Sequence, residues 1–305
     1  MASAERFGVY PASFVHAGGT LDLTQMESFR VTPQASKAEI IPAGSVDRAA
    51  VVTANSDARA QFGTKDLNTY FGSVSATAGL VLTGNATFRL QEREEAAAFL
   101  TGATHGTVVA TGGWIIPESL SASIEDNDGA VLRSIFQAFW DGTNAPFVFN
   151  DAVNFAAAPT PAFNSLFFLG PVYHNSVEIS GITNVSVNFG IQFNAAPKSP
   201  GPHKETGAIM RRTPEITFTT AKTDEGAGLD MFHRAVNTSF AVYFWKGANN
   251  SDRVAKATAE HCKISFTAGD IETTEVGGDG TEDAMLQTTV RPTGTIAVSV
   301  ASAIP

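Results

Sequence analysis

The segment P-E-S-L-S-A-S-I-E-D-N-D-G-A-V-L-R-S-I-F-Q-A-F, residues 117–139, returns in outline 97 residues later as P-E-I-T-F-T-T-A-K-T-D-E-G-A-G-L-D-M-F-H-R-A-V, residues 214–236. Proline, glutamate, glycine, alanine and leucine recur at matching positions without a gap. A second pair of segments, 21–31 and 177–187, matches at an offset of 156. The order of segments is the same in both halves. The sequence therefore predicts a tandem duplication rather than a solenoid, which needs at least three repeats.

The composition favours short strands and disfavours nucleic-acid binding. The 305 residues are 43% apolar and only 16% charged, with a net charge of −10. A nucleic-acid-binding face needs clustered lysine and arginine, and this charge balance argues against one. Residues 1–9 lack the blocks of a signal peptide, and no stretch reaches the roughly 18 apolar residues of a membrane span. The single cysteine, Cys262, excludes an internal disulfide, so we expect folding in a reducing cytosol.

Alternation of apolar and polar residues predicts strands along most of the chain. Residues 20–32 are typical of a strand pair with a turn near Gln25, and residues 176–193 repeat the pattern with a turn at Gly181. Further strands are expected at residues 38–41, 79–82, 86–91, 107–110, 146–149, 240–245, 262–268, 271–276, 285–290 and 293–301.

Three segments carry helical patterns. Residues 128–140 place five apolar side chains on one stripe: Val131, Leu132, Ile135, Phe136 and Phe139. The repeat of this segment, residues 225–236, carries a shorter stripe, and a third, short helix is expected at residues 91–100. A helix with one apolar stripe must cover another element, most simply one face of a sheet.

These elements predict a mainly β fold of two tandem β-sandwich or β-barrel domains, each with one flanking α-helix and long loops. The first domain would span residues 1–155 and contain a long insertion at about residues 33–113. The second would span residues 170–305. Its counterpart of the insertion is short, and Pro197, Pro200 and Pro202 within residues 195–212 predict a mobile loop there.

Residues 156–169 are expected to link the two domains. Three aromatic side chains, Phe163, Phe167 and Phe168, are unusual in such a linker because linkers are mostly polar. They either return to a hydrophobic core, which is the favoured interpretation, or dock on a partner.

No catalytic, cofactor or metal site is expected. The six histidines match no metal-ligand spacing, and the chain has neither a G-x-S-x-G elbow nor a phosphate-binding P-loop. His261 and Cys262 would point to opposite faces of a strand. Residues 126–129, D-N-D-G, resemble the start of a calcium loop but lack its terminal glutamate, so helix capping is favoured. The hypothesis is a protein that is not an enzyme, although catalytic groups can converge from distant positions.

The order of segments resembles that of the tail tube proteins, or major tail proteins, of tailed bacteriophages. The resemblance rests on residues 115–149 and 216–245, each containing a strand, a predicted helix and a second strand, and on residues 176–193. These segments cover about half the chain, and many β-sandwiches could share their patterns. The resemblance implies a β-sandwich or β-barrel core with one flanking helix, loops that bridge adjacent rings, and no cofactor. Most such proteins carry one tube domain, so a doubled chain implies a pseudo-sixfold ring of three copies.

The resemblance also implies a virion protein of the tail, made in the host bacterial cytoplasm, whose partners are copies of itself and other tail proteins. DNA would be only a non-specific passing cargo, which an acidic lumen wall would not retain. Unpaired strand edges favour lateral pairing, and a head-to-tail interface can close into a ring. Candidate lumen residues are Asp22 and Glu178, placed on the sheet face opposite the helix. Residues 33–113 and 195–212 are candidates for contacts between stacked rings.

Two other functions stay open. A capsid decoration or head–tail joining protein would share the composition but would not form tubes. A carbohydrate- or receptor-binding β-sandwich module would use Trp114, Trp140 and Trp245 to stack on sugar rings. Trp140 and Trp245 follow apolar segments and are expected to be buried, which weakens that alternative. An enzyme is the least favoured class.

Overall fold

The computed structural model describes residues 6–40, 50–93, 105–125, 129–154, 166–197, 201–221, 239–277 and 285–305. The fold is mainly β, with 67% of residues in strands and one α-helix among the described residues. The sheets are antiparallel, and most strands alternate buried and exposed side chains, as the sequence pattern predicts.

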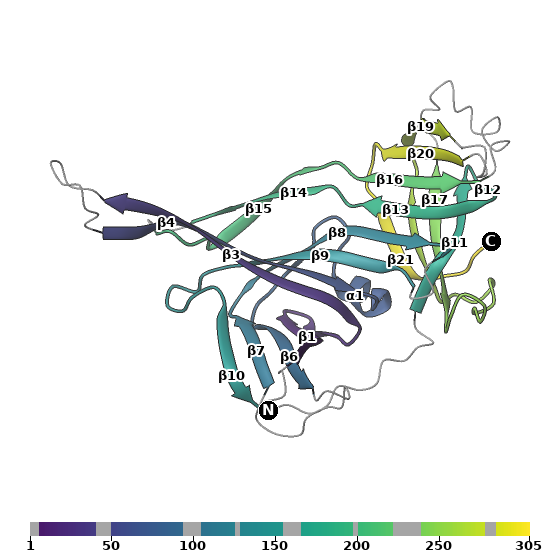
Figure 1. Ribbon diagram of the computed structural model, residues 1–305. Coiled ribbons are helices and arrows are strands. Elements are labelled where there is room, and N and C mark those ends of the chain that lie inside the picture. Colours follow the sequence, from purple (N-terminus) through teal and green to yellow (C-terminus); the bar gives the residue numbers. More distant parts are fainter. Residues whose placement is uncertain are drawn as a thin grey trace.

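The strands fall into two successive sets (Figure 1). The first half of the chain forms β1 (Arg6–His16), β2 (Gly19–Leu23), β3 (Met26–Ile40), β4 (Ala50–Thr64), α1 (Leu67–Ser73), β5 (Leu80–Val81), β6 (Ala86–Arg93), β7 (His105–Ala110), β8 (Gly113–Ser123), β9 (Val131–Ala138) and β10 (Val148–Val153). The second half forms β11 (Leu166–His174), β12 (Val177–Ile179), β13 (Ile182–Asn188), β14 (Ile191–Ala196), β15 (Thr206–Arg212), β16 (Glu215–Thr220), β17 (Phe240–Gly247), β18 (His261–Phe266), β19 (Gly269–Gly277), β20 (Met285–Pro292) and β21 (Ala297–Ser302).

One large sheet runs through both halves. Eight of its strands lie in the order β3-β4-β9-β8-β13-β16-β20-β19, and β5 pairs with one end of β8. We call it the central sheet. Each half also has a five-stranded sheet of its own, in the order β10-β7-β6-β1-β2 in the first half and β21-β18-β17-β11-β12 in the second. Figure 1 shows these two smaller sheets lying apart from each other, beside the central sheet.

The two halves have the same topology. Strand by strand, β1 corresponds to β11, β2 to β12, β6 to β17, β7 to β18 and β10 to β21 in the smaller sheets. In the central sheet, β3, β4, β9 and β8 correspond to β13, β16, β20 and β19. Every described strand of the smaller sheets therefore has a counterpart in the same place, which is what duplication of one domain produces.

The registers of the strands repeat as well. Pairing of β8 with β9 shifts between Pro117 and Ser119, and pairing of β19 with β20 shifts between Thr273 and Glu275, at an offset of 156. A β-bulge is a local feature that costs one unpaired residue, so its recurrence at an equivalent position is strong evidence for common descent of the halves. Phe62 and Phe218 keep the same offset and pair with equivalent residues of β3 and β13.

A single hydrophobic core extends through both halves. In the first half, Phe14, Phe62, Phe88 and Phe136 lie with ring centroids 5.3–6.1 Å apart. In the second half, the ring of Phe240 stacks between those of Phe218 and Phe266. Such pairs add about 0.5–1.5 kcal/mol each beyond burial of their area. This accounts for the unusual abundance of phenylalanine.

The predicted helix at residues 128–140 is wrong, because residues 131–138 form β9 and residues 126–128 lie outside the described residues. Strand β9 lies between β4 and β8 in the middle of the central sheet. Leu132, Ser134 and Phe136 point into the core, while Val131 and Ile135 are half-buried on the other face. A central strand with apolar residues on both faces has the same spacing of apolar residues as one stripe of a helix, and the β-branched residues favour the strand.

The helix predicted at residues 225–236 lies outside the described residues. Of the one at residues 91–100, residues 91–93 belong to β6.

The repeat at an offset of 97 is also contradicted, since it would equate β8 with β16, whose counterparts are β19 and β4. The repeat at an offset of 156 agrees with the topology. Under this repeat, residues 33–113 are not an insertion. They hold the rest of β3 together with β4 to β7 and α1, and the second half has counterparts of β3, β4, β6 and β7. The expected strand pair at residues 20–32 consists of consecutive strands, but β2 and β3 belong to different sheets.

The described helix, α1, was not anticipated. It is short, its N-cap side chain makes no capping hydrogen bond, and Leu67 and Tyr70 are its buried residues. The Asp66 carboxylate instead accepts hydrogen bonds from the Thr24 backbone and hydroxyl, at 2.8 and 2.9 Å. Phe71 on α1 lies 5.8 Å from Phe189 of the second half, between ring centroids. The helix therefore packs against both halves without any sequence signal of its boundaries.

Two long hairpins leave the central sheet on the same side (Figure 1). One is formed by β3 and β4, the other by β14 and β15, so residues 195–212, predicted to be a loop, contain strand residues at both ends. Pro197 and Pro202 lie between β14 and β15, where missing N–H donors break no ladder, and Pro200 lies outside the described residues. A kink at Gly190, with a φ of 60°, separates β13 from β14. A Cβ there would lie 1.9 Å from the Thr213 carbonyl oxygen.

Candidate assembly interface

The junction between the halves is a strand pair in the central sheet. Strands β8 and β13 pair antiparallel over five residues, from Ser119 opposite Asn188 to Ser123 opposite Asn184. Outside this ladder, the Phe189 N–H donates to the Glu118 carbonyl at 3.0 Å and the Ile124 N–H donates to the Thr183 carbonyl at 2.9 Å. We call this pairing the inner junction. It joins the edge strand of the first half, β8, to a different edge strand of the second half, β13.

The two outer edges of the central sheet are of the same two kinds. One edge is β3, the counterpart of β13, and the other is β19, the counterpart of β8. At both edges the sheet order ends, so residues 27–32 and 271–277 have no ladder partner on one side among the residues that the structure describes. An edge of this kind offers a row of backbone donors and acceptors to a further strand.

Apolar residues at the outer edges are more exposed than their counterparts in the inner junction. Leu120 in the inner junction is 0% exposed, whereas its counterpart Val276 is 56% exposed. Val187 is fully buried, whereas its counterpart Val31 is half-buried at the core rim. The difference arises because β13 covers Leu120 and β8 covers Val187. Each outer edge thus corresponds to one of the two strands of the inner junction, without the strand that pairs with it there.

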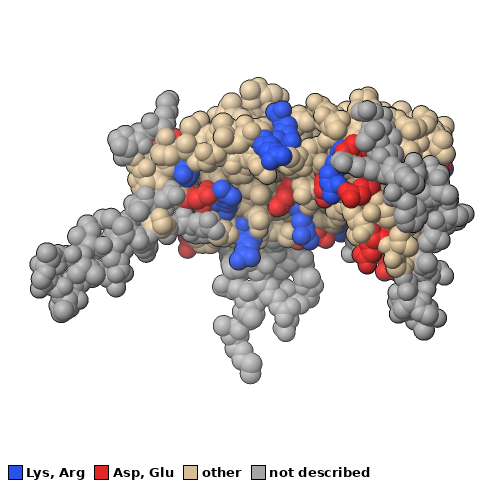
Figure 2. Space-filling view, turned by 90° about the horizontal axis from the view of Figure 1, so that it is seen from above, with Lys and Arg blue, Asp and Glu red and all other residues tan. Residues whose placement is uncertain are grey.

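The central sheet has one open face, turned away from the core. The uncharged side chains on this face mostly carry hydroxyl or amide groups: Ser28, Thr32, Gln61, Ser119, Ser121, Asn184, Ser186, Asn188, Thr217, Thr219, Gln287 and Thr289. Arginines and acids are interspersed, and Arg59 pairs with Asp57 at 2.8 Å while Arg291 contacts both Glu215 and Glu272. Figure 2 shows lysine and arginine mixed with acidic side chains on a largely uncharged surface. A hollow of about 470 Å³ on the open face includes Arg30, Glu118 and Arg133.

The β14–β15 hairpin is held against the first half. The Ser56 N–H donates to the Pro202 carbonyl at 2.7 Å, and the Trp140 N–H donates to the Lys204 carbonyl at 2.8 Å. The Arg59 guanidinium lies 5.1 Å from the centroid of the Phe193 ring. Whether such hairpins also reach a neighbouring molecule, as expected for residues 33–113 and 195–212, stays a prediction.

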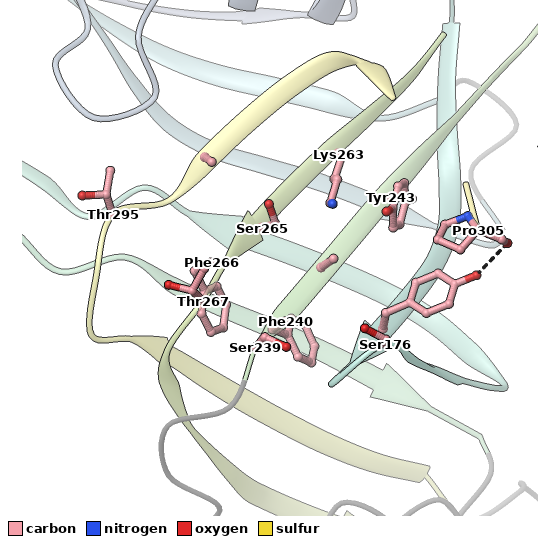
Figure 3. A pocket seen from close by; sticks show the side chains of 13 residues that line it. Ser176, Ser239, Phe240, Tyr243, Lys263, Ser265, Phe266, Thr267, Thr295 and Pro305 are labelled. Carbon is pink, nitrogen blue, oxygen red and sulfur yellow. Dashed lines mark hydrogen bonds between the residues drawn. The ribbon is translucent and has the colours of Figure 1, made fainter. Parts of the chain in front are cut away.

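A separate pocket of about 510 Å³ lies on the outer face of the smaller sheet of the second half (Figure 3). Tyr173 and Tyr243 line it, with ring centroids 5.6 Å apart, and the Lys263 ammonium lies 5.6 Å from the Tyr243 ring. Ile304 packs on both tyrosines, so their ring faces are buried. Burial, with Glu178 nearby, raises the pKa of Tyr173 to about 12. The counterparts of Tyr243 and Lys263 in the first half are Arg89 and Thr107, so this pocket is not duplicated.

The predicted site residues are dispersed. Asp22 on β2 and Glu178 on β12 are exposed and occupy equivalent positions, but on the edges of the smaller sheets rather than on the central sheet. Phe167 and Phe168 are buried in β11, which confirms the core interpretation for these two, while Phe163 lies outside the described residues. Neither set forms a common site.

The tryptophans do not form a sugar-stacking platform. Trp114 is buried and its indole N–H donates to the Ala78 carbonyl at 2.9 Å. Trp140 and Trp245 are half-buried rather than buried as predicted. Trp140 lies 5.2 Å from His203 between ring centroids, and Arg253 and Lys256 lie over Trp245 at 5.0 and 5.4 Å. Each ring already has a polar or cationic neighbour within the chain.

The described residues contain no group of three or more histidine, cysteine or acidic side chains that could hold a metal ion. His261 and Cys262 occupy adjacent positions of β18 and are both buried. His261 accepts a hydrogen bond from the Lys246 N–H at 3.2 Å, and burial raises the pKa of Cys262 to about 12. A buried protonated thiol is a poor nucleophile and a poor metal ligand.

A scan against protein-family models found no match for this chain, and a search of curated proteins found no similar sequence. No helix among the described residues is long and apolar enough to cross a membrane. The residues of the outer edges, including Arg30, Glu275 and Val276, were not singled out from the sequence. Extending the offset of 156 beyond residues 21–31 aligns Ile115 with Ile271 and Leu120 with Val276, but it does not show which of these strands is outermost in the sheet.

Proposed function

We propose that this protein is a structural subunit that assembles head to tail, through the outer edges of the central sheet, into a ring of the bacteriophage tail tube kind. Strand β19 of one copy pairs with β3 of the next, and stacked rings form a tube. The observation that carries the proposal is the inner junction, in which the counterparts of these two edges already pair. The role is one of assembly, without catalysis.

Repetition of the inner junction gives a heterologous contact, because β19 and β3 are different surfaces. Contacts of this type close into a ring when the rotation between neighbours divides a full turn. Closure leaves neither edge of the central sheet exposed, which removes the tendency of these edge strands to aggregate.

Three copies, the number that the family resemblance implies, would close a barrel of about 24 strands. With about 4.8 Å between strands and a tilt of about 40°, its backbone diameter is roughly 48 Å, enough for a DNA duplex to pass. The open face of the central sheet then lines the lumen, which replaces Asp22 and Glu178 as the lining. Hydroxyl and amide groups with scattered, partly paired charges offer DNA phosphates no continuous cationic track.

The test compares the wild type with two matched variants. Val276→Lys places a charge where the ring would bury the side chain, and Val177→Lys places one on β12, at a valine that is 68% exposed. We expect rings or tubes in negative-stain electron microscopy, and a matching mass by light scattering, for the wild type and for Val177→Lys. Val276→Lys is expected to stay monomeric with an unchanged circular dichroism spectrum.

Two results would overturn the proposal. One is a wild type that stays monomeric at high concentration. The other is a Val276→Lys variant that forms the same rings as the wild type. Discrete particles that never stack would favour a decoration or joining protein instead.

A further inference from the structure

We infer that Arg30 of one copy and Glu275 of the next form an ion pair across the outer junction, and that this pair determines which edges join. The inference rests on the proposed function and names the residues that give the contact its direction. It follows from transferring the register of the inner junction to the outer edges by the offset of 156.

The transferred register places three pairs opposite each other. In the inner junction, Ser119, Leu120 and Ser121 lie opposite Asn188, Val187 and Ser186. Their counterparts are Glu275, Val276 and Gly277 on β19, and Thr32, Val31 and Arg30 on β3. Val276 then packs against Val31 on the core face. Glu275, Gly277, Thr32 and Arg30 lie on the open face.

On that face, Arg30 lies directly opposite Gly277 and diagonal to Glu275. Diagonal neighbours of antiparallel strands are within reach of long side chains. The absence of a side chain at Gly277 leaves room for the guanidinium. In the single chain, Glu275 Oε1 already lies 3.8 Å from the position of a Cβ at Gly277, so the carboxylate stands beside that room.

Both side chains are available for the contact. Arg30 and Glu275 are exposed, and neither forms an ion pair or side-chain hydrogen bond with another described residue. Arg30 lines the hollow of the open face together with Gln61, Glu118 and Arg133. The guanidinium is the charged group that best suits a carboxylate across a strand pair.

The charges also disfavour wrong pairings. Two β19 edges would bring Glu272 and Glu275 of both copies together, and two β3 edges would bring both Arg30 side chains together. Like charges on neighbouring strands are destabilising, so only the unlike edges combine well. The inner junction lacks this device, because Ser119 and Ser186 occupy the equivalent positions.

A charge-reversal experiment tests the inference. Arg30→Glu and Glu275→Arg are each expected to raise the concentration needed for ring formation by roughly tenfold or more, because an attraction becomes a repulsion at every junction. The double variant is expected to assemble nearly as well as the wild type. High salt, at about 1 M, should weaken the effect of the single changes because it screens exposed charges. Asp252→Arg, at an exposed acidic residue between β17 and β18, serves as the charge-reversal control and should assemble normally.

The outcomes separate the two proposals. If the wild type does not assemble, the proposed function fails. If the wild type assembles but the single reversals assemble equally well, or the double variant is not rescued, the ion pair is refuted and the ring proposal stands. Should a reversal variant misfold, Thr32→Cys combined with Glu275→Cys decides the register. Oxidation must link copies into covalent rings, and a failure to link assembled copies would refute the register.

Discussion

The contact between Tyr70 on α1 and Ser134 on β9 offers a quantitative test of how the helix is held. The Ser134 hydroxyl donates to the Tyr70 hydroxyl at 2.8 Å, and both side chains are 0% exposed. Tyr70→Phe or Ser134→Ala alone leaves one buried hydroxyl without this partner. Each should lower the free energy of unfolding by about 1–3 kcal/mol. The double variant removes both groups, so its loss should be no larger than that of one single variant.

The assay is urea unfolding of the four proteins at concentrations where the chain is monomeric, with the slope m held common. Burial raises the pKa of Tyr70 well above its usual value, so the phenol stays neutral and the cycle should give the same result at pH 6 and pH 9. The expected coupling energy is about 1–2 kcal/mol. Single costs that simply add, with a coupling below about 0.3 kcal/mol, would refute the contact.

Two further predictions concern β8 and β18. A Cβ at Gly113 would lie 2.4 Å from the Gln137 carbonyl oxygen, whereas one at Gly112 would meet nothing within 4 Å. Gly113→Ala should therefore lower the free energy of unfolding by about 1–3 kcal/mol and Gly112→Ala by less than about 0.5, and equal costs in urea would contradict this. Because burial raises the pKa of Cys262 to about 12, the folded chain keeps a proton that the unfolded chain loses above about pH 8.5. Stability present below that pH should fall as the pH rises towards 12, by up to about 1.4 kcal/mol per unit, and Cys262→Ala should fall less steeply; parallel curves would refute the assignment.

Much of the fold could be predicted because apolar and polar residues alternate along the strands of a half-buried antiparallel sheet. Nearly every expected strand is present, including β6, β17 and β20. Strand β9 was missed because it is central and apolar on both faces, where periodicity over so few residues does not separate strand from helix. Helix α1 was missed because two turns held by Leu67 and Tyr70 depend on tertiary packing rather than on local signals.

The outer edges that we propose for assembly could not be predicted because they depend on which strands are outermost. Val276 alternates like any half-buried strand residue, and only the topology places it where no neighbour covers it. The offset of 97 misled for a related reason. Pro214 and Glu215 lie at the start of β16, whereas Pro117 and Glu118 lie inside β8, at its register shift against β9, and the two strands occupy different places in their halves. A short shared motif therefore does not fix the position of a strand in a sheet.

Duplication places different demands on the two kinds of junction. Strands β8 and β13 belong to one chain, so they meet at a high effective concentration and need no device that selects a partner. Their paired residues accordingly carry no charge, from Ser119 opposite Asn188 to Ser123 opposite Asn184. In the proposed ring, β3 and β19 must each select one partner among all edges in solution; β3 carries Arg30, and β19 carries Glu272 and Glu275. Replacing Arg30 and Glu275 by serine would copy the inner junction and should leave lateral pairing intact while losing its direction. Like-edge dimers would then compete with rings, because in the proposed assembly the charges at the outer edges are what restrict pairing to unlike edges.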